Sequence, residues 1–182
     1  MLYKFIEILI SAIVLIPVFV LLNRTMFHNI RKTVLYFVFA VYLAVVYLFV
    51  GMPTLQFMRF EVSLTLVPFL PMVADFKNTI LNIILFVPLG IMLPFLWKKY
   101  NTLKAAAVFG FMMSLSIELL QLFTYRATDI NDLIANTLGT VFGYFLFRMI
   151  SYLVPSVRNV AKRKTEVAAV IVPVILVMFF VQ

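Results

Sequence analysis

The chain has 182 residues, of which 65% are apolar, 16% aromatic and only 12% charged. A soluble globular domain has about 45–50% apolar and about 25% charged residues, so this composition excludes a water-soluble domain. There is no cysteine and only one histidine, His28, which excludes disulfides, thiolate chemistry and zinc sites built from Cys and His.

The apolar runs predict an all-α, polytopic transmembrane helical bundle that forms a single domain over residues 1–182. Each membrane crossing needs about 20 apolar residues, which leaves room for about six helices. Pro88, Pro94 and Pro173 fall inside predicted helices, but membrane helices tolerate proline because neighbouring groups satisfy the freed carbonyls. The six predicted spans are Phe5–Leu22, Val34–Val50, Asn78–Trp97, Ala105–Phe123, Leu133–Leu153 and the short Val167–Val181.

Lysine and arginine are divided unevenly between the two sides of this bundle. The loops after the first, third and fifth spans carry Arg24, Arg31, Lys32, Lys98, Lys99, Lys104, Arg158, Lys162, Arg163 and Lys164. The opposite side carries Lys4, Arg59, Lys77 and Arg126. Because cytoplasmic loops are rich in Lys and Arg, both termini are expected on the extracytoplasmic side of the membrane. The net charge of +8 then reflects orientation and attraction to anionic lipid, not a nucleic-acid partner.

Most of the seven acidic residues fall on the other, extracytoplasmic side. Only Glu166 is expected at the cytoplasmic face. The remaining six, at or near the outer face, are Glu7, Glu61, Asp75, Glu118, Asp129 and Asp132. Glu118 lies within a predicted span and shares one helical face with Ser114 and Gln121. An ionisable group at that depth is expected to face the bundle interior or a water-filled cavity, although a paired structural role is the alternative.

A second polar face begins the fifth predicted span. Asp129, Asp132 and Asn136 recur at helical spacing, and Gly139 and Gly143 continue the helix. Helix capping by Asp129, a favourable dipole interaction for Asp132 and close packing through the glycines would explain part of the pattern. Two aspartates, the nearby Arg126 and a membrane-embedded asparagine exceed what a cap requires, which favours a functional cluster.

The start of the third span repeats this spacing. Asp75-x-x-Asn78-x-x-x-Asn82 matches Asp129-x-x-Asp132-x-x-x-Asn136, and the match slightly favours a duplicated unit. Two parallel helices would then present similar polar faces near the outer surface. Asn82 and Asn136, buried in spans, are expected to find hydrogen-bond partners among these faces.

A long outer segment, Gly51–Lys77, precedes this third span. Polar and apolar residues alternate between Gln56 and Leu66, and Pro68 and Pro71 are expected to end that pattern. The segment is either a partly ordered lid over the polar residues or an amphipathic connector.

The middle of the chain, about residues 63–153, resembles the VanZ-like family of bacterial membrane proteins. The resemblance is carried by Asn82-Ile-Ile-Leu-Phe-Val-Pro-Leu-Gly90, by Glu118-x-x-Gln121, and by Arg126-x-x-Asp129-x-x-Asp132-x-x-x-Asn136-x-x-Gly139-x-x-x-Gly143. The chain departs from the family at Thr65, where an asparagine is frequent. The last predicted span lies outside the resemblance. The resemblance implies lowered susceptibility to teicoplanin and lipoglycopeptide antibiotics, without defining a biochemical activity.

Three classes of function remain open. The first is an envelope protein whose outer cavity binds a membrane lipid, a lipid-linked cell-wall precursor or the glycopeptide's anchoring site. Its ligand-binding residues would be Arg126, Gln121, Asn82, Asn136, Asp75 and Asn78. The second is an enzyme acting on a lipid-linked substrate. Its catalytic carboxylates, also candidate ligands for a hard divalent cation such as Mg²⁺, would be Glu118, Asp129 and Asp132. The third, less favoured, is a transporter.

Overall fold

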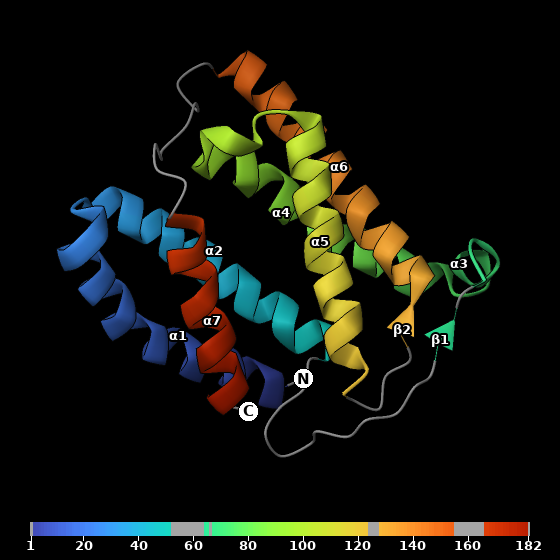
Figure 1. Ribbon diagram of the computed structural model, residues 1–182, viewed down its shortest axis with the longest axis horizontal. Helices are drawn as coiled ribbons and strands as arrows, with labels where there is room; N and C mark the ends of the chain where they lie inside the picture. Colours follow the sequence, from blue (N-terminus) through green and yellow to red (C-terminus); the bar gives the residue numbers. More distant parts are fainter. Residues whose placement is uncertain (1, 52–63, 66, 124–127, 155–165, 182) are drawn as a thin grey trace. The chain divides into compact units, whose positions relative to one another are not determined.

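The computed structural model describes residues 2–51, 64–65, 67–123, 128–154 and 166–181, and these are almost entirely helical (Figure 1). The predicted all-α class is confirmed. The longer helices are α1 (Leu2–Leu22), α2 (Ile30–Val50), α4 (Phe76–Leu96), α5 (Leu103–Gln121), α6 (Ile130–Leu153) and α7 (Glu166–Val181). The shorter elements are the π-helix η1 (Asn23–Phe27), α3 (Leu70–Ala74), the 3₁₀ turn η2 (Lys98–Tyr100) and two strands, β1 (Leu64–Thr65) and β2 (Thr128–Asp129).

Each predicted span is a helix. Within the described residues, five helical stretches are long and apolar enough to cross a membrane: Tyr3–Phe27, Ile30–Val50, Phe76–Leu96, Leu103–Gln121 and Ile130–Leu153. The sixth predicted span corresponds to α7, whose 16 residues extend about 24 Å. That length is less than the hydrocarbon thickness of about 30 Å. The expected continuity through proline is confirmed, since α4 runs through Pro88 and Pro94 and α7 through Pro173.

The outer segment contains an element that the sequence did not predict, the five-residue helix α3 (Leu70–Ala74). Pro71 is its second residue, a position where proline is tolerated because the first-turn N–H groups have no partner within the helix. Most of the alternating stretch between Gln56 and Leu66 lies outside the described residues. Its described part includes β1, which pairs in parallel with β2, with Thr65 opposite Asp129.

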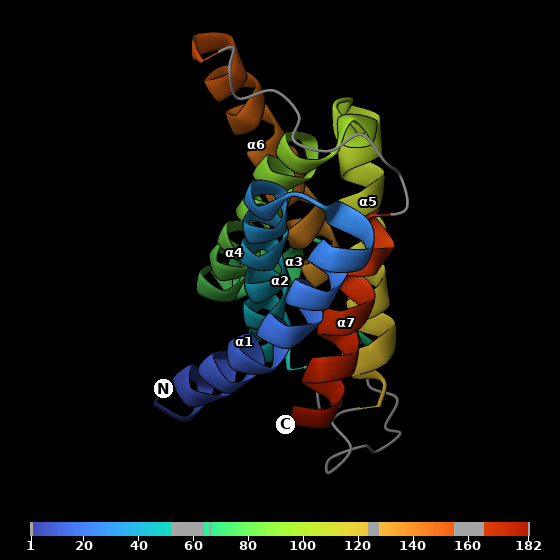
Figure 2. The same ribbon diagram turned by 90° about the vertical axis from the view of Figure 1, so that its left-hand side faces the viewer.

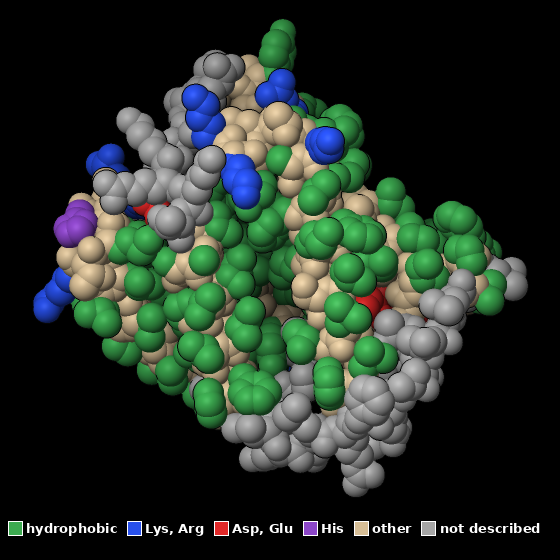
Figure 3. All heavy atoms as spheres, in the orientation of Figure 1, with side chains coloured by type: hydrophobic (Ala, Val, Ile, Leu, Met, Phe, Trp, Pro, Cys, Tyr) green, Lys and Arg blue, Asp and Glu red, His purple; other side chains and the backbone are tan. Residues whose placement is uncertain are grey.

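The chain divides into two compact units. Unit 1 comprises residues 1–58 and 163–182, and unit 2 comprises residues 59–162, which contains the stretch 63–153 that carries the resemblance. The single transmembrane domain over residues 1–182 stays a prediction. In unit 1, α7 packs against both α1 and α2 (Figure 2). Hydrophobic side chains cover most of the visible length of these helices (Figure 3), and His28 is the C-cap residue of η1, between α1 and α2 in the chain.

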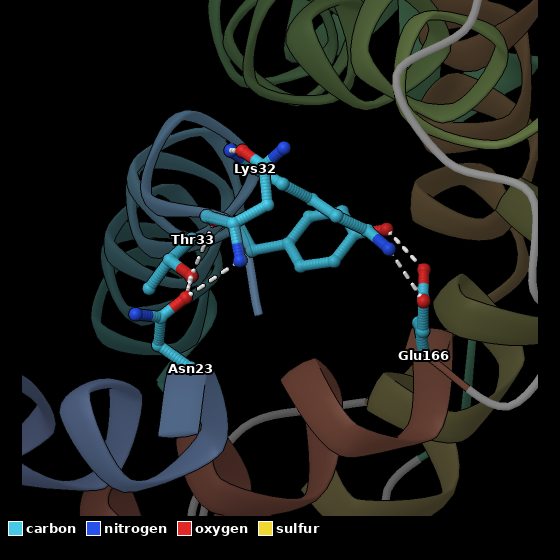
Figure 4. Close-up of polar contacts among 6 residues, drawn as sticks. Asn23, Lys32, Thr33 and Glu166 are labelled. Carbon is cyan, nitrogen blue, oxygen red and sulfur yellow. Dashed lines mark hydrogen bonds and ion pairs between the residues drawn. The ribbon is translucent and has the colours of Figure 1, made fainter. Parts of the chain in front are cut away.

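A buried ion pair fixes the start of α7 on α2 (Figure 4). Lys32 Nζ lies 2.5 Å from Glu166 Oε1, and the Tyr36 hydroxyl donates to Glu166 Oε2 at 2.7 Å. Glu166 is 1% exposed, so both oxygens of a buried carboxylate are occupied. A buried charge is tolerated only when it is paired and hydrogen-bonded, so these contacts specify where α7 begins against α2.

In unit 2, α4 and α6 run parallel and are in close backbone contact. A Cβ at Gly139 would collide with the Ile83 carbonyl, and one at Gly143 would collide with the Val87 carbonyl. The later residue of α6, Gly143, meets the later residue of α4, Val87. The two helices therefore run in the same direction, and the prediction that they are parallel is confirmed. Small residues allow helices to approach closely within a membrane, which is the packing role expected of this glycine motif.

Candidate functional site

Five of the polar residues predicted from the sequence gather around the first two turns of α6: Asn82, Glu118, Asp129, Asp132 and Asn136. The N-cap of α6 is Asp129, whose side chain accepts a hydrogen bond from the Asn131 backbone N–H at 2.8 Å. The Asp129 backbone N–H donates in turn to Glu118 Oε2 at 2.8 Å. In a capping box, the third residue of the helix supplies that acceptor. Here Glu118, on α5, supplies it from a different helix.

Asp132 is the third residue of α6, and its carboxylate contacts α4. Asn82 donates from Nδ2 to Asp132 Oδ1 at 2.6 Å. A carboxylate in the first turn of a helix is also favoured by the positive end of the helix dipole. The expectation that Asn82 finds a partner on the opposing polar face is therefore confirmed.

Asn136 lies one turn further along α6 and faces α5. Its Nδ2 donates to Ser114 Oγ at 2.9 Å, and both side chains are buried. Asn136 Oδ1 is buried and has no hydrogen-bond partner among the described residues. Most buried polar groups in proteins do have a partner, so this amide is the most unusual polar group of the cluster.

Asn82, Ser114, Glu118, Asp129, Asp132 and Asn136 are called the α6 polar cluster below. Glu118 is 3% exposed and Asn136 is 2% exposed, although both belong to helices long and apolar enough to cross a membrane. Burying an ionisable group at such a position is costly, and residues of this kind typically mark functional sites. The cluster draws carboxylate, amide and hydroxyl groups from α4, α5 and α6.

Of the other predicted site residues, two lie away from the α6 polar cluster and one lies outside the described residues. Asp75 and Asn78 are exposed at the start of α4, where Asp75 caps the helix by accepting from the Asn78 backbone N–H at 3.3 Å. Arg126 lies outside the described residues. Gln121 is the last residue of α5 and is buried on the same face as Glu118.

A residue that the sequence analysis missed, Asn131, joins the outer segment to α6. Its Nδ2 donates to the Val67 carbonyl, and its Oδ1 accepts from the Phe69 backbone N–H, each at 2.9 Å. Asn131 is 4% exposed. Its Nδ2 also donates to Asp129 Oδ1 at 2.7 Å. No spacing signal marked Asn131, because a single asparagine in the first turn of a helix is ordinary, and the groups that it contacts in the outer segment are backbone groups 62 and 64 positions away.

A metal site built from carboxylates needs several acidic side chains directed at one point. No group of three or more Asp, Glu, His or Cys side chains within the described ranges is placed to hold a metal ion. Glu118 and Asp129 are linked through the Asp129 backbone, whereas Asp132 contacts Asn82.

Comparison with known proteins gives a consistent result. The family model described as VanZ/LLP1 matches residues 33–151, which include most of α2, all of α4 and α5, and nearly all of α6. The chain is also similar to Protein VanZ of Enterococcus faecium, with 38% identity over 86 residues. That match covers 47% of this chain and spans about half, 52%, of the relative. No solved structure matches.

Proposed function

The chain belongs to the VanZ/LLP1 family and is a multi-pass membrane protein, and from this we propose that it lowers the susceptibility of a bacterial cell to teicoplanin and lipoglycopeptide antibiotics. The proposed route is binding of the polar head of a lipid-linked cell-wall precursor by the α6 polar cluster. The cluster then faces the extracytoplasmic side of the cytoplasmic membrane, as the distribution of Lys and Arg favours.

One observation carries this proposal: a buried carboxylate, Glu118, is held within membrane-spanning helices beside a second polar pair, Ser114 and Asn136. Capping of α6 accounts for Asp129 and for the contact between Glu118 and the Asp129 N–H, but not for the Asp132–Asn82 pair or the buried Ser114–Asn136 pair. The carboxylates of Glu118 and Asp132 accept hydrogen bonds from the Asp129 N–H and from Asn82 Nδ2, and ionised carboxylates are strong acceptors. Sugar hydroxyls and peptide N–H groups, which a cell-wall precursor presents in number, are donors that suit such acceptors.

Antibiotic susceptibility tests this proposal directly. The chain and its variants are expressed in a glycopeptide-susceptible host, and the minimal inhibitory concentration of teicoplanin is measured at equal membrane levels. The wild type is expected to raise it several-fold. Glu118→Gln and Asp132→Asn are expected to return it toward the empty-vector value, because each keeps an acceptor oxygen for Asp129 N–H or Asn82 but loses the carboxylate.

Glu7→Gln is the matched control, since Glu7 lies in α1 and outside the matched residues 33–151. It is expected to behave as the wild type. If Glu118→Gln and Asp132→Asn both retain full resistance, the cluster is not the site. If the wild type leaves susceptibility unchanged, the proposed function itself is wrong. A change in extracted lipid intermediates that depends on Glu118 would instead favour a membrane enzyme.

A further inference from the structure

The short segment that enters α4 carries exposed apolar side chains that no membrane-crossing helix accounts for. Val67 is 56% exposed, Phe69 65% and Val73 77%. All three precede the candidate span Phe76–Leu96. In water, apolar side chains exposed to this extent would be unfavourable, because apolar surface gains free energy when it leaves water.

The backbone of this segment is fixed in an uncommon conformation. Phe69 has φ of 66°, in the left-handed region that residues other than glycine and asparagine rarely adopt. Its N–H is held by the buried Asn131 side chain, and its carbonyl accepts from the Val73 N–H at 3.2 Å, which begins α3. A residue keeps a strained backbone conformation only where surrounding contacts hold it in place. The hydrogen bonds at Phe69 therefore fix the position of its exposed ring.

The same asparagine links the segment to the α6 polar cluster. The Asn131 backbone N–H donates to Asp129 Oδ1, and the Asp129 backbone N–H donates to Glu118. The parallel pairing of β1 with β2 adds a second tie, with Thr65 opposite Asp129. The exposed apolar residues and the buried carboxylate are therefore connected through two residues at the start of α6.

We propose that Val67, Phe69 and Val73 form an apolar lip that inserts into the lipid surface at the boundary between head groups and acyl chains. Position favours lipid as the occupant, because the lip directly precedes a membrane-crossing helix that begins with the 65% exposed Phe76, while Asp75, Lys77 and Asn78 beside it are exposed and polar. Segments that lie at this boundary bury Phe and aliphatic side chains there while their polar side chains face the head groups.

The lip also suggests how a ligand would reach the α6 polar cluster, an inference that rests on the proposed function. A ligand anchored in the bilayer would approach along Phe69, with its acyl part in lipid, and its polar head would reach the α6 polar cluster. Asn131 is the positioning residue, because it holds the lip backbone and the N-cap of α6 at once.

Spin labelling tests the lip without reference to resistance. The chain has no native cysteine, so Phe69→Cys and Val73→Cys each provide a single label site in the full chain reconstituted in liposomes of phosphatidylglycerol and phosphatidylethanolamine. Collision with oxygen, which partitions into lipid, is compared with collision with a water-soluble nickel chelate. Leu138→Cys, on the exposed face of α6, is the lipid reference, and Lys104→Cys is the aqueous reference.

Labels at residues 69 and 73 are expected to show an oxygen-to-nickel ratio between the two references and clearly above that of residue 104. A ratio equal to that of residue 104 would overturn the lip. Adding Asn131→Ala to Phe69→Cys is expected to increase label mobility, whereas Asn131→Asp, which keeps the acceptor for the Phe69 N–H, should change it less. Equal label mobility with asparagine, alanine or aspartate at position 131 would show that Asn131 does not hold the lip.

The two proposals fail separately. Loss of resistance in Glu118→Gln together with a fully aqueous label at residue 69 would support the binding site and contradict the lip. A lipid-exposed label at residue 69 together with normal resistance in Glu118→Gln would support the lip and contradict the binding site.

Discussion

Glu118 performs a capping role from outside the helix that it caps. In a conventional capping box, the N-cap N–H would be satisfied by the acid at the third position of the same helix. In α6 that acid is Asp132, which contacts Asn82 of α4 instead. Because Glu118 takes over the cap, Asp132 is available to join α4 to α6, and the two carboxylates connect three helices.

The buried Ser114–Asn136 pair gives a test at the residue scale. Ser114→Ala removes the acceptor of the Asn136 Nδ2, which is expected to destabilise the protein by about 1–3 kcal/mol, because the amide is left buried without that partner. Thermal unfolding in detergent measures the change.

Ser116→Ala is the control on the same helix. Ser116 is exposed, and its hydroxyl donates only to the Met112 carbonyl one turn earlier. Its unfolding temperature is expected to stay near the wild-type value. An equal fall in unfolding temperature in Ser114→Ala and Ser116→Ala would mean that the Ser114–Asn136 hydrogen bond does not stabilise the protein more than the exposed one.

The sequence located most of the α6 polar cluster, and physical reasons explain the parts it did not. Helical spacing placed Asp129, Asp132 and Asn136 on one helix, and the cost of burial called for partners for the asparagines. Spacing within one helix does not show which residues of different helices meet, so the Glu118–Asp129 contact was not foreseen. Asn131 was missed because the groups that it holds in the outer segment are a backbone carbonyl and a backbone N–H, which carry no sequence signal.

At the scale of elements, α4 and α6 depend on glycine for their contact. Gly143→Ala is expected to push the helices apart, because the added Cβ meets the Val87 carbonyl and the Gly90 Cα, neither of which can rotate away. Overpacking of this kind typically costs about 1–3 kcal/mol. The measurement is the unfolding temperature in detergent, together with the yield of folded protein.

Phe142→Ala provides the comparison for Gly143→Ala at the adjacent position. Phe142 is 57% exposed, so its truncation removes lipid-facing surface and not helix contact. A smaller effect is expected for it than for Gly143→Ala. A well-tolerated Gly143→Ala would contradict the close approach of α4 and α6.

The element pair α2 and α7 is tested through its ion pair. Glu166→Leu alone leaves Lys32 without its partner in a largely buried position, and breaking a buried pair costs roughly 3–5 kcal/mol. The double variant Lys32→Met, Glu166→Leu removes both charges and is expected to recover most of that loss. Protease resistance of α7 in detergent reports the difference.

Arg31→Met is the control for the ion pair, since Arg31 is the exposed neighbour of Lys32. It should leave the protease resistance of α7 unchanged. A double variant as unstable as Glu166→Leu would show that the charges themselves are not what holds α7.

For the whole molecule, composition and hydrophobic runs were sufficient to predict the class and the helices, because membrane-spanning segments must satisfy their backbone internally. The sixth predicted span, α7, stays a prediction, because its 16 helical residues are fewer than the about 20 of a typical crossing. Composition and hydrophobic runs missed α3, because a five-residue helix that begins next to prolines has no periodic signature.

Orientation is a prediction of the whole chain and can be checked by cysteine labelling in intact cells. Thr25→Cys, in the exposed turn after α1, is expected to react with a membrane-impermeant maleimide only after lysis. Lys77→Cys, at the exposed start of α4, is expected to react before lysis. The reverse pattern would place the α6 polar cluster on the cytoplasmic side and exclude a ligand from the outer leaflet.

Binding of the ligand itself tests the central claim most directly. A lipid-linked cell-wall precursor, its disaccharide-peptide intact, is titrated into nanodiscs that hold the wild type, Glu118→Gln or Glu7→Gln, and its dissociation constant is measured. The wild type and Glu7→Gln are expected to bind equally, and Glu118→Gln at least tenfold more weakly. Equal binding by all three proteins, or no binding by the wild type, would contradict the assignment of the α6 polar cluster as the site.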